Sequence, residues 1–345
     1  MKKRKSESMN TEDNQRIKDF KSILEQAILD SNQVFVVAHD NPDLDAIASA
    51  IGVYFIVKTK FKKDCFIVIN DSLEHIEAGV KKVIDKEKSK IPFINLKKYH
   101  ELKGEKDLLV TTDVNKKNRV SLTDCLNEFS NIVLIDHHSE DDYTIDSDKK
   151  FITCGVSSAS EIITKLFCEF KVNIDENLAT YLLAGIKLDT VNYSKNTDTD
   201  TLDMIKKLFK SGAKNEEVQD LFQENFESDV RIGDLIKKLK FNMFQYALGV
   251  ALEGEVYSRE EIAKAADKAL KYGVDASFII GYLDEECKTV GISARSNGKL
   301  NVGKLMEEFG GGGNPTAAAT IVTDATVSDL ESRLTLKLSN PYCTK

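Results

Sequence analysis

The most constraining feature of this sequence is an alternation of short apolar runs with helical patterns. Four runs are rich in Val and Ile and have the length of buried strands. They are residues 34–38, 65–69, 108–111 and 132–135. Apolar residues at helical spacing follow the first run, at 46–58, and the second, at 73–85. Strands that alternate with helices form a parallel sheet with helices on both faces, so we predict an α/β fold. Such sheets bind ligands at the carboxyl ends of their strands.

A second α/β pattern begins after a mostly helical stretch, in which 159–170 and 177–186 are the clearest helices. The predicted strands of the second domain are 247–252, 276–282, 289–294 and 318–322, and its predicted helices are 260–272 and 302–309. The chain of 345 residues can form two domains that each bury a core. The predicted parts are a basic tail at 1–10, a first domain at 11–222 with a helix at 11–29, a connecting helix at 223–240 and a smaller domain at 241–345. We expect the two domains to face each other across a cleft.

The composition limits the classes of partner. A net charge of -8 disfavours a broad electrostatic grip on long nucleic acid, whereas a small anionic ligand stays compatible with it. The sequence contains no run of about 18 apolar residues, so we expect no membrane span. The basic start lacks the apolar core of a signal peptide, and we expect a cytoplasmic protein.

Four apolar elements of the first domain each end in carboxylates, imidazoles or both. These residues are His39, Asp43 and Asp45 after the first strand, Asp113 after the third, Asp136, His137 and His138 at the fourth, and Asp189 at the end of a later apolar segment. A single Asp at the end of a strand is typical of a turn. Several carboxylates at one edge would repel each other unless cations neutralised them. Oxygen and imidazole ligands without cysteine suit Mn²⁺ or Mg²⁺ rather than a structural zinc ion.

Three features could bind a substrate phosphate. Arg295 offers a planar bidentate fork, although an ordinary surface ion pair is the alternative. The glycines at 310–313 would let backbone N–H groups approach an anion, and a helix C-cap with a turn is the alternative. Ser157, Ser158 and Ser160 could meet a phosphate at the positive end of the helix at 159–170, and capping alone is the alternative.

The order of these motifs resembles the DHH phosphoesterase family. HDNPDLDA, then Asp113, then Asp136-His137-His138, then GIKLDT look like its four motifs. ISARS at 292–296 and GGGG at 310–313 resemble the DHH-associated substrate domain. Within the family, LLAGIKLDTVNYSKNT and GISARSNGKLNVGKLMEEFGGGG are similar to the cyclic di-AMP phosphodiesterases. Those enzymes often carry upstream membrane and sensory segments. We expect no such segment in this chain, so the expectation is a stand-alone catalytic module.

The resemblance implies a centre of two Mn²⁺ ions, with Mg²⁺ or Co²⁺ as substitutes. The first ion would be held by His39 and Asp43, the second by Asp45, His137 and Asp189, and Asp113 would bridge them. A bridging hydroxide would be the nucleophile. Asp136 would hold His137 in its metal-binding tautomer. His138 would face the substrate phosphate or the leaving group.

The expected reaction is hydrolysis of cyclic di-AMP to linear pApA. The alternatives are a short-oligonucleotide exonuclease or adenosine 3',5'-bisphosphate phosphatase, and a catalytically weak nucleotide-binding protein. The expected substrate contacts are Ser158, Arg295, Gly311, Gly312, Gly313 and Asn314. Asn314 departs from the family, which usually has His after the four glycines, and Asn cannot carry a positive charge. A homodimer is a candidate assembly.

Overall fold

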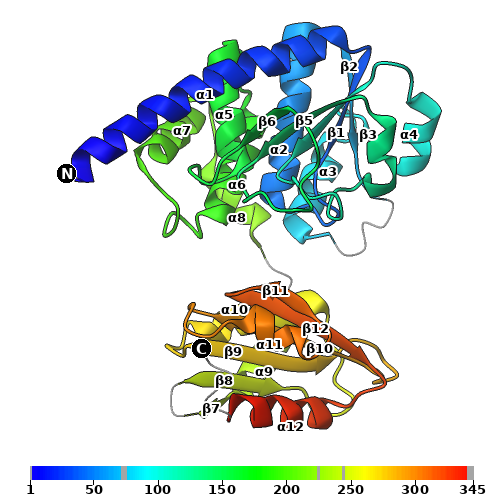
Figure 1. The fold of residues 1–345 in the computed structure, drawn as a ribbon, viewed down its shortest axis with the longest axis vertical. Helices are drawn as coiled ribbons and strands as arrows, with labels where there is room; N and C mark the ends of the chain where they lie inside the picture. Colours follow the sequence, from blue (N-terminus) through cyan, green and yellow to red (C-terminus); the bar gives the residue numbers. More distant parts are fainter. Residues whose placement is uncertain (1, 71–75, 224–225, 243–244, 340–345) are drawn as a thin grey trace. The chain divides into compact units, whose positions relative to one another are not determined.

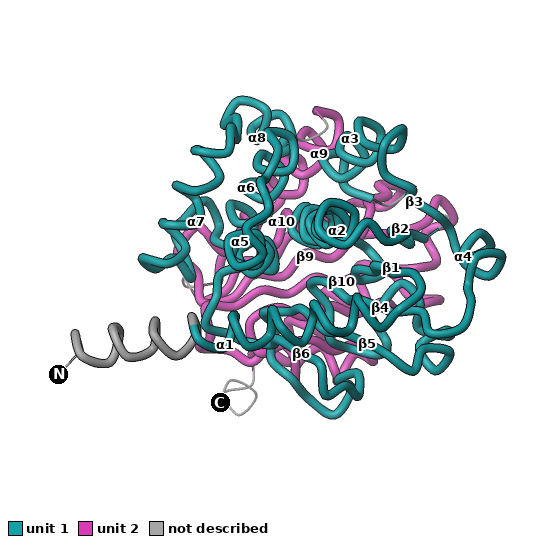
Figure 2. The backbone as a smooth tube through the Cα atoms, turned by 90° about the horizontal axis from the view of Figure 1, so that it is seen from above, with its two compact units in different colours: residues 1–223 teal, residues 224–345 magenta. Residues whose placement is uncertain are grey.

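The computed structural model describes residues 2–70, 76–223, 226–242 and 245–339. Its internal contacts divide the chain into two compact units, residues 1–223 and residues 224–345 (Figure 2). The predicted connecting segment at 223–240 contains helix α9 (Phe226–Lys237), which belongs to the second unit. In the parts of the chain that the structure describes, no helix has both the length and the apolar character needed to cross a bilayer.

Unit 1 is built on a six-stranded parallel sheet with the strand order β3-β2-β1-β4-β5-β6 (Figure 1). The strands are β1 (Gln33–Val37), β2 (Asp64–Val68), β3 (Phe93–Ile94), β4 (Leu108–Thr112), β5 (Asn131–Asp136) and β6 (Lys149–Ile152). The predicted α/β fold with a parallel sheet is confirmed. The four predicted strands correspond to β1, β2, β4 and β5. The strands β3 and β6, which are short and form the two edges of the sheet, were not predicted.

Successive residues of the central strands face opposite sides of the sheet, and each side has its own core. Val34 and Val36 pack in a large cluster with α1, α2, α5 and α6, whereas Phe35 and Val37 pack with α4 and a 3₁₀ helix, η3. Helices therefore cover both faces. The helical elements of unit 1 are α1 (Lys2–Asp30), α2 (Leu44–Ile56), the π-helix η1 (Val57–Phe61), α3 (Ala78–Glu87), α4 (Leu96–Leu102), η3 (Thr123–Glu128), α5 (Ala159–Phe170), α6 (Glu176–Asp189), α7 (Thr199–Lys210) and α8 (Asn215–Leu221).

Two predicted boundaries at the start of helices differ from the structure. Residues 2–10, predicted as a basic tail, form the first turns of α1, so the helix begins earlier than the predicted 11–29. The helix predicted at 73–85 is α3, which begins at Ala78. Residues 73–75 of that prediction, including His75, lie outside the described residues.

Unit 2 contains a six-stranded mixed sheet with the order β11-β12-β10-β9-β8-β7, in which only β8 and β9 are parallel. Its strands are β7 (Lys240–Asn242), β8 (Tyr246–Val250), β9 (Ala276–Tyr282), β10 (Thr289–Ser296), β11 (Gly312–Asn314) and β12 (Ala317–Thr323), and its helices besides α9 are α10 (Arg259–Leu270), α11 (Val302–Glu307) and α12 (Val327–Leu338). The four predicted strands correspond to β8, β9, β10 and β12. Short β7 and β11, as well as α12, were not predicted.

The order of strands in unit 1 fixes where a ligand site can form. The chain moves outward from β1 to β2 and β3, then returns to place β4 on the other side of β1. The chain segments that follow β1 and β4 therefore run in opposite directions along the sheet. In parallel sheets, this reversal leaves a crevice at the carboxyl ends of the two strands.

Candidate metal centre

Three neighbouring strands of unit 1 end in residues of the candidate site. β1, β4 and β5 are adjacent and parallel. His39 follows β1, Asp113 follows β4 directly, and Asp136 is the last residue of β5, with His137 and His138 next in the chain. Because the carboxyl ends of parallel strands meet at one edge, these side chains gather where the strand order reverses.

Two helices add three more carboxylates to this edge. Asp43 is the N-cap of α2, and its Oδ1 accepts hydrogen bonds from the N–H groups of Asp45 (2.9 Å) and Ala46 (3.0 Å). Its Oδ2 lies 3.9 Å from His39 Nε2. Asp45 is in the first turn of α2, and Asp189 is the last residue of α6. The cap thus uses one oxygen of Asp43 and leaves the other facing His39.

Asp113 lies between two groups of potential ligands. Its Oδ2 is 3.7 Å from His39 Nε2, and its Oδ1 is 3.3 Å from His137 Nε2. The side chain is almost fully buried, and the backbone adopts a left-handed conformation with φ of 58°. Strained backbone of this kind is common where a functional side chain must be aimed. Each carboxylate oxygen of Asp113 therefore faces a different histidine.

Three overlapping sets of donor atoms share Asp113; one of them combines Asp113 and His137 with Asp136 and His138, and the other two contain the expected metal ligands. Within each set, one ligand atom from every residue lies within 4.8 Å of the others. Of the latter two, the first set is His39, Asp43 and Asp113, and the second is Asp45, Asp113, His137 and Asp189. All six residues expected to bind metal are therefore brought together in these two sets.

The buried carboxylates carry more negative charge than their surroundings can stabilise. Burial raises the pKa of Asp45 and Asp113 well above the ordinary value, and the charge of Asp189 adds to the effect on Asp45. Burial also raises the pKa of Asp43. A raised carboxyl pKa means that the ionised form is disfavoured unless an opposite charge is nearby. A divalent cation would supply that charge.

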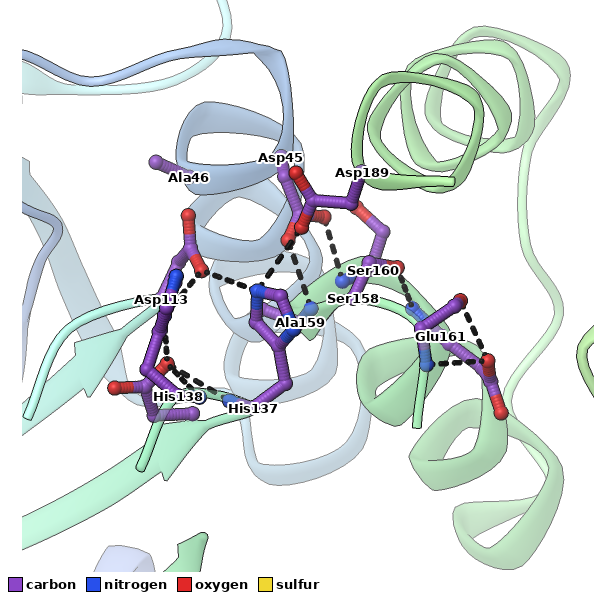
Figure 3. A network of polar contacts seen from close by, with 12 residues as sticks. Asp45, Ala46, Asp113, His137, His138, Ser158, Ala159, Ser160, Glu161 and Asp189 are labelled. Atoms are coloured by element: carbon purple, nitrogen blue, oxygen red, sulfur yellow. Dashed lines mark hydrogen bonds and ion pairs between the residues drawn. The ribbon is translucent and has the colours of Figure 1, made fainter. Parts of the chain in front are cut away.

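The pKa values of the two imidazoles shift in opposite directions. Burial lowers the pKa of His39. Burial also opposes the charged form of His137, but the adjacent carboxylates of Asp113 and Asp189 raise its pKa to about 11. His137 Nε2 is 2.9 Å from Asp189 Oδ2 and is drawn between the two carboxylates in Figure 3.

Three donor atoms of this site lie close together without aligned hydrogen bonds. His137 Nε2, Asp113 Oδ1 and Asp189 Oδ2 are buried, and none makes an aligned hydrogen bond. Ligand atoms that converge without aligned hydrogen bonds fit a shared metal ion, since an ion would satisfy all three at once. The donor set contains only carboxylates and imidazoles, which suits Mn²⁺ or Mg²⁺.

The predicted role of Asp136 toward His137 is wrong. Asp136 Oδ1 contacts His138 Nδ1 at 2.8 Å, and it accepts hydrogen bonds from the backbone N–H groups of His137 (2.7 Å) and His138 (3.1 Å). Asp136 therefore orients the ring of His138, while it fixes His137 only through the backbone. The His138 side chain is 57% exposed, so its Nε2 is free to meet a ligand.

The start of α5 binds the carboxylate of Asp45. The N–H groups of Ala159 and Ser160 donate to Asp45 Oδ2 (2.7 Å) and Oδ1 (2.8 Å), as Figure 3 shows. Ser158 is fully buried as the N-cap, and its hydroxyl accepts the Glu161 N–H at 3.1 Å. In this structure, Ser158 thus corresponds to the capping alternative. The sequence analysis missed the roles of Ala159 and Ser160, because nothing in the local pattern signals a contact with α2.

Arg295 and Asn314 occupy one row across the sheet of unit 2. Both pair with Ala317 of β12, Arg295 from β10 and Asn314 from β11. Directly paired residues point to the same face, so these two side chains share a face roughly 10 Å apart, with a small alanine between them. Arg295 Nε donates to Asp267 Oδ1 (2.8 Å), and Nη1 donates to Ser293 Oγ (3.0 Å). The guanidinium is therefore pre-oriented.

Three of the four glycines at 310–313 have a structural reason. Gly310 has φ of 80° and follows α11, while the Gly311 N–H donates to Met306 O, so the predicted C-cap alternative applies to Gly310. A Cβ atom would lie 2.2 Å from Ala319 O at Gly311 and 2.5 Å from Ala317 O at Gly313. Gly312 is different, because a Cβ atom there would meet nothing within 4 Å.

A further group of donors lies away from this centre. His100, Cys125 and Glu128 have ligand atoms within 4.8 Å of one another. Glu128 Oε2, however, accepts hydrogen bonds from Lys103 Nζ (2.7 Å) and Tyr99 Oη (2.8 Å). Because the ammonium already neutralises Glu128 and would repel a cation, we assign no metal to this group.

Comparisons with known proteins agree with the motifs. Residues 33–186 match the DHH family N-terminal domain, and residues 244–337 match the DHHA1 domain. The chain belongs to the DHH phosphoesterase family. This confirms the family expected from the sequence.

Two kinds of curated relative stand out. The cyclic-di-AMP phosphodiesterase GdpP of Geobacillus thermodenitrificans is 33% identical over 319 residues, which cover 90% of this chain and 48% of that protein. The bifunctional oligoribonuclease and PAP phosphatase NrnA of Mycoplasma genitalium is 24% identical over 332 residues, which cover 90% of this chain and 96% of that protein. The chain thus spans about half the length of the curated cyclic-di-AMP phosphodiesterases that it matches.

Solved structures share the fold. An exopolyphosphatase-related protein from Bacteroides fragilis aligns with a TM-score of 0.77 at 20% identity, covering 92% of this chain and 96% of that one. The exonuclease RecJ, in a structure bound to manganese, aligns with a TM-score of 0.56 at 12% identity, covering 94% and 95% of the two chains.

Proposed function

We propose that this DHH-family chain is a manganese-dependent phosphodiesterase that hydrolyses cyclic di-AMP to linear pApA. The observation that carries the proposal is the pair of overlapping donor sets that share Asp113. His39 and Asp43 would hold the first ion, Asp45, His137 and Asp189 would hold the second, and Asp113 would take part in both sites. The relatives GdpP and PdeA, named as cyclic-di-AMP phosphodiesterases, support the choice of substrate.

The chain's own residues set the geometry of the reaction. When bound, the two cations supply an activated water and neutralise the phosphate oxygens. His138 keeps its Nδ1 toward Asp136, so the exposed Nε2 is placed to exchange a proton with the leaving oxygen. Asp136 is a positioning residue for His138 in this scheme. In unit 2, Arg295 and Asn314 bind a second phosphate of the dinucleotide, and Gly312 leaves room for its close approach.

A second candidate is a short-oligonucleotide exonuclease with adenosine 3',5'-bisphosphate phosphatase activity. The similarity to NrnA favours it, because the alignment covers 96% of that protein. The metal centre does not distinguish these two reactions. We therefore propose that residues of unit 2 select the substrate.

The test is a set of parallel assays with added Mn²⁺, using cyclic di-AMP, cyclic di-GMP, pApA and adenosine 3',5'-bisphosphate, with the products separated. We expect pApA from cyclic di-AMP at the highest kcat/KM. Faster cleavage of pApA or the bisphosphate would favour the second candidate. Binding of cyclic di-AMP without turnover of any substrate would identify a nucleotide-binding protein instead.

A further inference from the structure

Asp45 depends on the first turn of α5 for its position. Both carboxylate oxygens are held by backbone N–H groups, those of Ala159 and Ser160. The side chain of Asp45 has no exposed surface. Any shift of the start of α5 would therefore move this ligand relative to His137 and Asp189.

A single buried carboxylate fixes this turn of α5. Glu161 is 1% exposed, and its Oε2 accepts hydrogen bonds from the Ser157 N–H (3.1 Å) and the Ser157 hydroxyl (2.6 Å). Its Oε1 pairs with Lys165 Nζ at 2.7 Å, one helical turn further along. Glu161 thus ties the segment before α5 to the helix itself.

The same carboxylate reaches a second element. The Thr201 hydroxyl, in the first turn of α7, donates to Glu161 Oε2 at 2.8 Å. Thr201 also forms a capping box with Asp198. The segment at 190–198 connects Asp189 to this helix start. Glu161 therefore joins the start of α5, which holds Asp45, to the first turn of α7, which follows Asp189 in the chain after the segment at 190–198.

A capping role alone does not explain a buried charged pair here. Removing Glu161 and Lys165 from water costs free energy, and well-packed neutral residues often replace such pairs without loss of stability. The N-cap of α5 is already supplied by Ser158. Partners that hold metal ligands in place typically change metal affinity by about 10- to 100-fold when they are lost.

We infer that Glu161 and Lys165 are a positioning pair that sets the geometry of the second ion site. This inference rests on the proposed function in so far as Asp45, His137 and Asp189 bind that ion. Glu161 acts through Asp45 and touches neither metal nor substrate.

Calorimetric titration with Mn²⁺ tests the pair, with Glu87→Gln as a matched control. Glu87 is a second buried carboxylate of unit 1, and it binds Tyr181 Oη (2.8 Å) and Asn177 Nδ2 (3.1 Å) at the start of α6. Glu161→Gln should weaken the second Mn²⁺ by about 10- to 100-fold. Glu87→Gln should leave both Mn²⁺ affinities within about twofold. It also removes one buried charge, but the contacts of Glu87 lie toward the start of α6, whereas Asp189 is the last residue of that helix. Equal losses in the two variants would overturn the inference.

A double variant separates positioning from stability. Glu161→Gln with Lys165→Met removes both charges of the pair and leaves Asp200, whose Oδ2 lies 3.8 Å from Lys165 Nζ, without that cation, so it should restore part of the stability lost in the single variant. Its affinity for the second Mn²⁺ should stay low, because Ser157 and Thr201 still lack their carboxylate. Recovery of affinity together with stability would show a merely structural role. Thr201→Val should reproduce part of the loss of affinity, and Thr201→Ser, which keeps the hydroxyl, should restore it.

Amide hydrogen exchange tests the pair without any metal. Protection of the Ala159 and Ser160 amides reports their bonds to Asp45. In Glu161→Gln these amides should exchange about tenfold faster, as expected for the loss of one well-made hydrogen bond. Unchanged protection would overturn the inference. If the wild-type protein binds no Mn²⁺ while Glu161→Gln still shows the faster exchange, the proposed function would be overturned and the positioning of Asp45 by Glu161 would stand.

Discussion

Gly185 of α6 lies against Asp45 of α2. A Cβ atom at position 185 would lie 2.6 Å from Asp45 Oδ1 and 2.2 Å from Ser160 Oγ. Real Cβ atoms do not approach other atoms so closely, so only glycine lets α6 pass beside the carboxylate. The packing of α6 against α2 therefore limits the position of Asp45, a proposed metal ligand.

Gly185→Ala should destabilise unit 1 by about 1–3 kcal/mol through overpacking. It should also weaken binding of Mn²⁺, because the new methyl group displaces Asp45 or Ser160. Urea unfolding and calorimetric titration measure the two effects. Gly233→Ala is the control, since Gly233 lies inside α9 with nothing within 4 Å of a Cβ atom. That change should stabilise unit 2 by roughly 0.5–1 kcal/mol and leave Mn²⁺ binding unaltered.

Replacement of single carboxylates by amides should separate the two ions. Asp43→Asn keeps the N-cap of α2, because Asn caps as well as Asp, and removes only the charge facing His39. Elemental analysis should then show the loss of about one Mn²⁺ per chain. Asp113→Asn keeps the left-handed backbone, which Asn tolerates, and should lower the occupancy of both ions. Full occupancy by both ions in Asp113→Asn would contradict the bridging assignment.

The sequence predicted the central strands because burial on both faces requires nearly continuous apolar residues, as in VFVV and LLVTT. It also predicted which residues would meet at the sheet edge. The edge strands β3 and β11 contain two and three residues, too few for a periodic signal. The first turns of α1 were missed for a different reason, because their charged residues indicated a tail.

Side-chain partners within the site could not be predicted in the same way. The bond from the Ala159 N–H to Asp45 joins positions 114 residues apart, and only the packing of α5 against α2 creates it. Asp136 contacts the ring of its second neighbour, His138, because the chain turns directly after β5. Neither partner follows from residue type or spacing. For the glycines at 310–313, in contrast, the sequence offered the same explanations for all four, and the structure distinguishes two cases. The fold requires glycine at Gly310, Gly311 and Gly313, whereas a Cβ atom at Gly312 would meet nothing within 4 Å.

Binding of Mn²⁺ should release protons at pH 8. The pKa of His137, raised to about 11 by Asp113 and Asp189 against the effect of burial, lies above this pH, so the imidazole is protonated before metal binds. A metal ligand must be deprotonated, so metal affinity should rise as pH increases toward 11. Calorimetry in two buffers with different ionisation enthalpies measures the number of protons released. A value of zero would contradict the raised pKa.

Arg295→Ala should weaken capture of a dinucleotide while both ions stay in place. Loss of a charge-assisted bidentate contact is worth about 2–3 kcal/mol, which corresponds to roughly thirty- to more than hundredfold in kcat/KM. The stability of unit 2 should change little, because the partner Asp267 is 54% exposed and remains solvated. A small model phosphodiester that does not reach unit 2 serves as the control substrate. Unchanged kinetics with cyclic di-AMP would return Arg295 to the role of a surface ion pair.

Asn314→His should improve kcat/KM for cyclic di-AMP, most clearly at acidic pH. Asn314 is exposed on β11 and shares a row with Arg295, so an imidazole fits without disturbing the core. A protonated imidazole offers a charge-assisted hydrogen bond to phosphate, and such bonds are about twice as strong as the neutral bond of Asn. The gain should fade as pH rises above about 6.5, where an unperturbed histidine loses its charge. Kinetics of both forms from pH 5.5 to 8.5 would measure it, with the Mn²⁺ content checked at each pH. If the two forms give the same values throughout, Asn314 suits only the turn before Pro315 and does not contact the substrate.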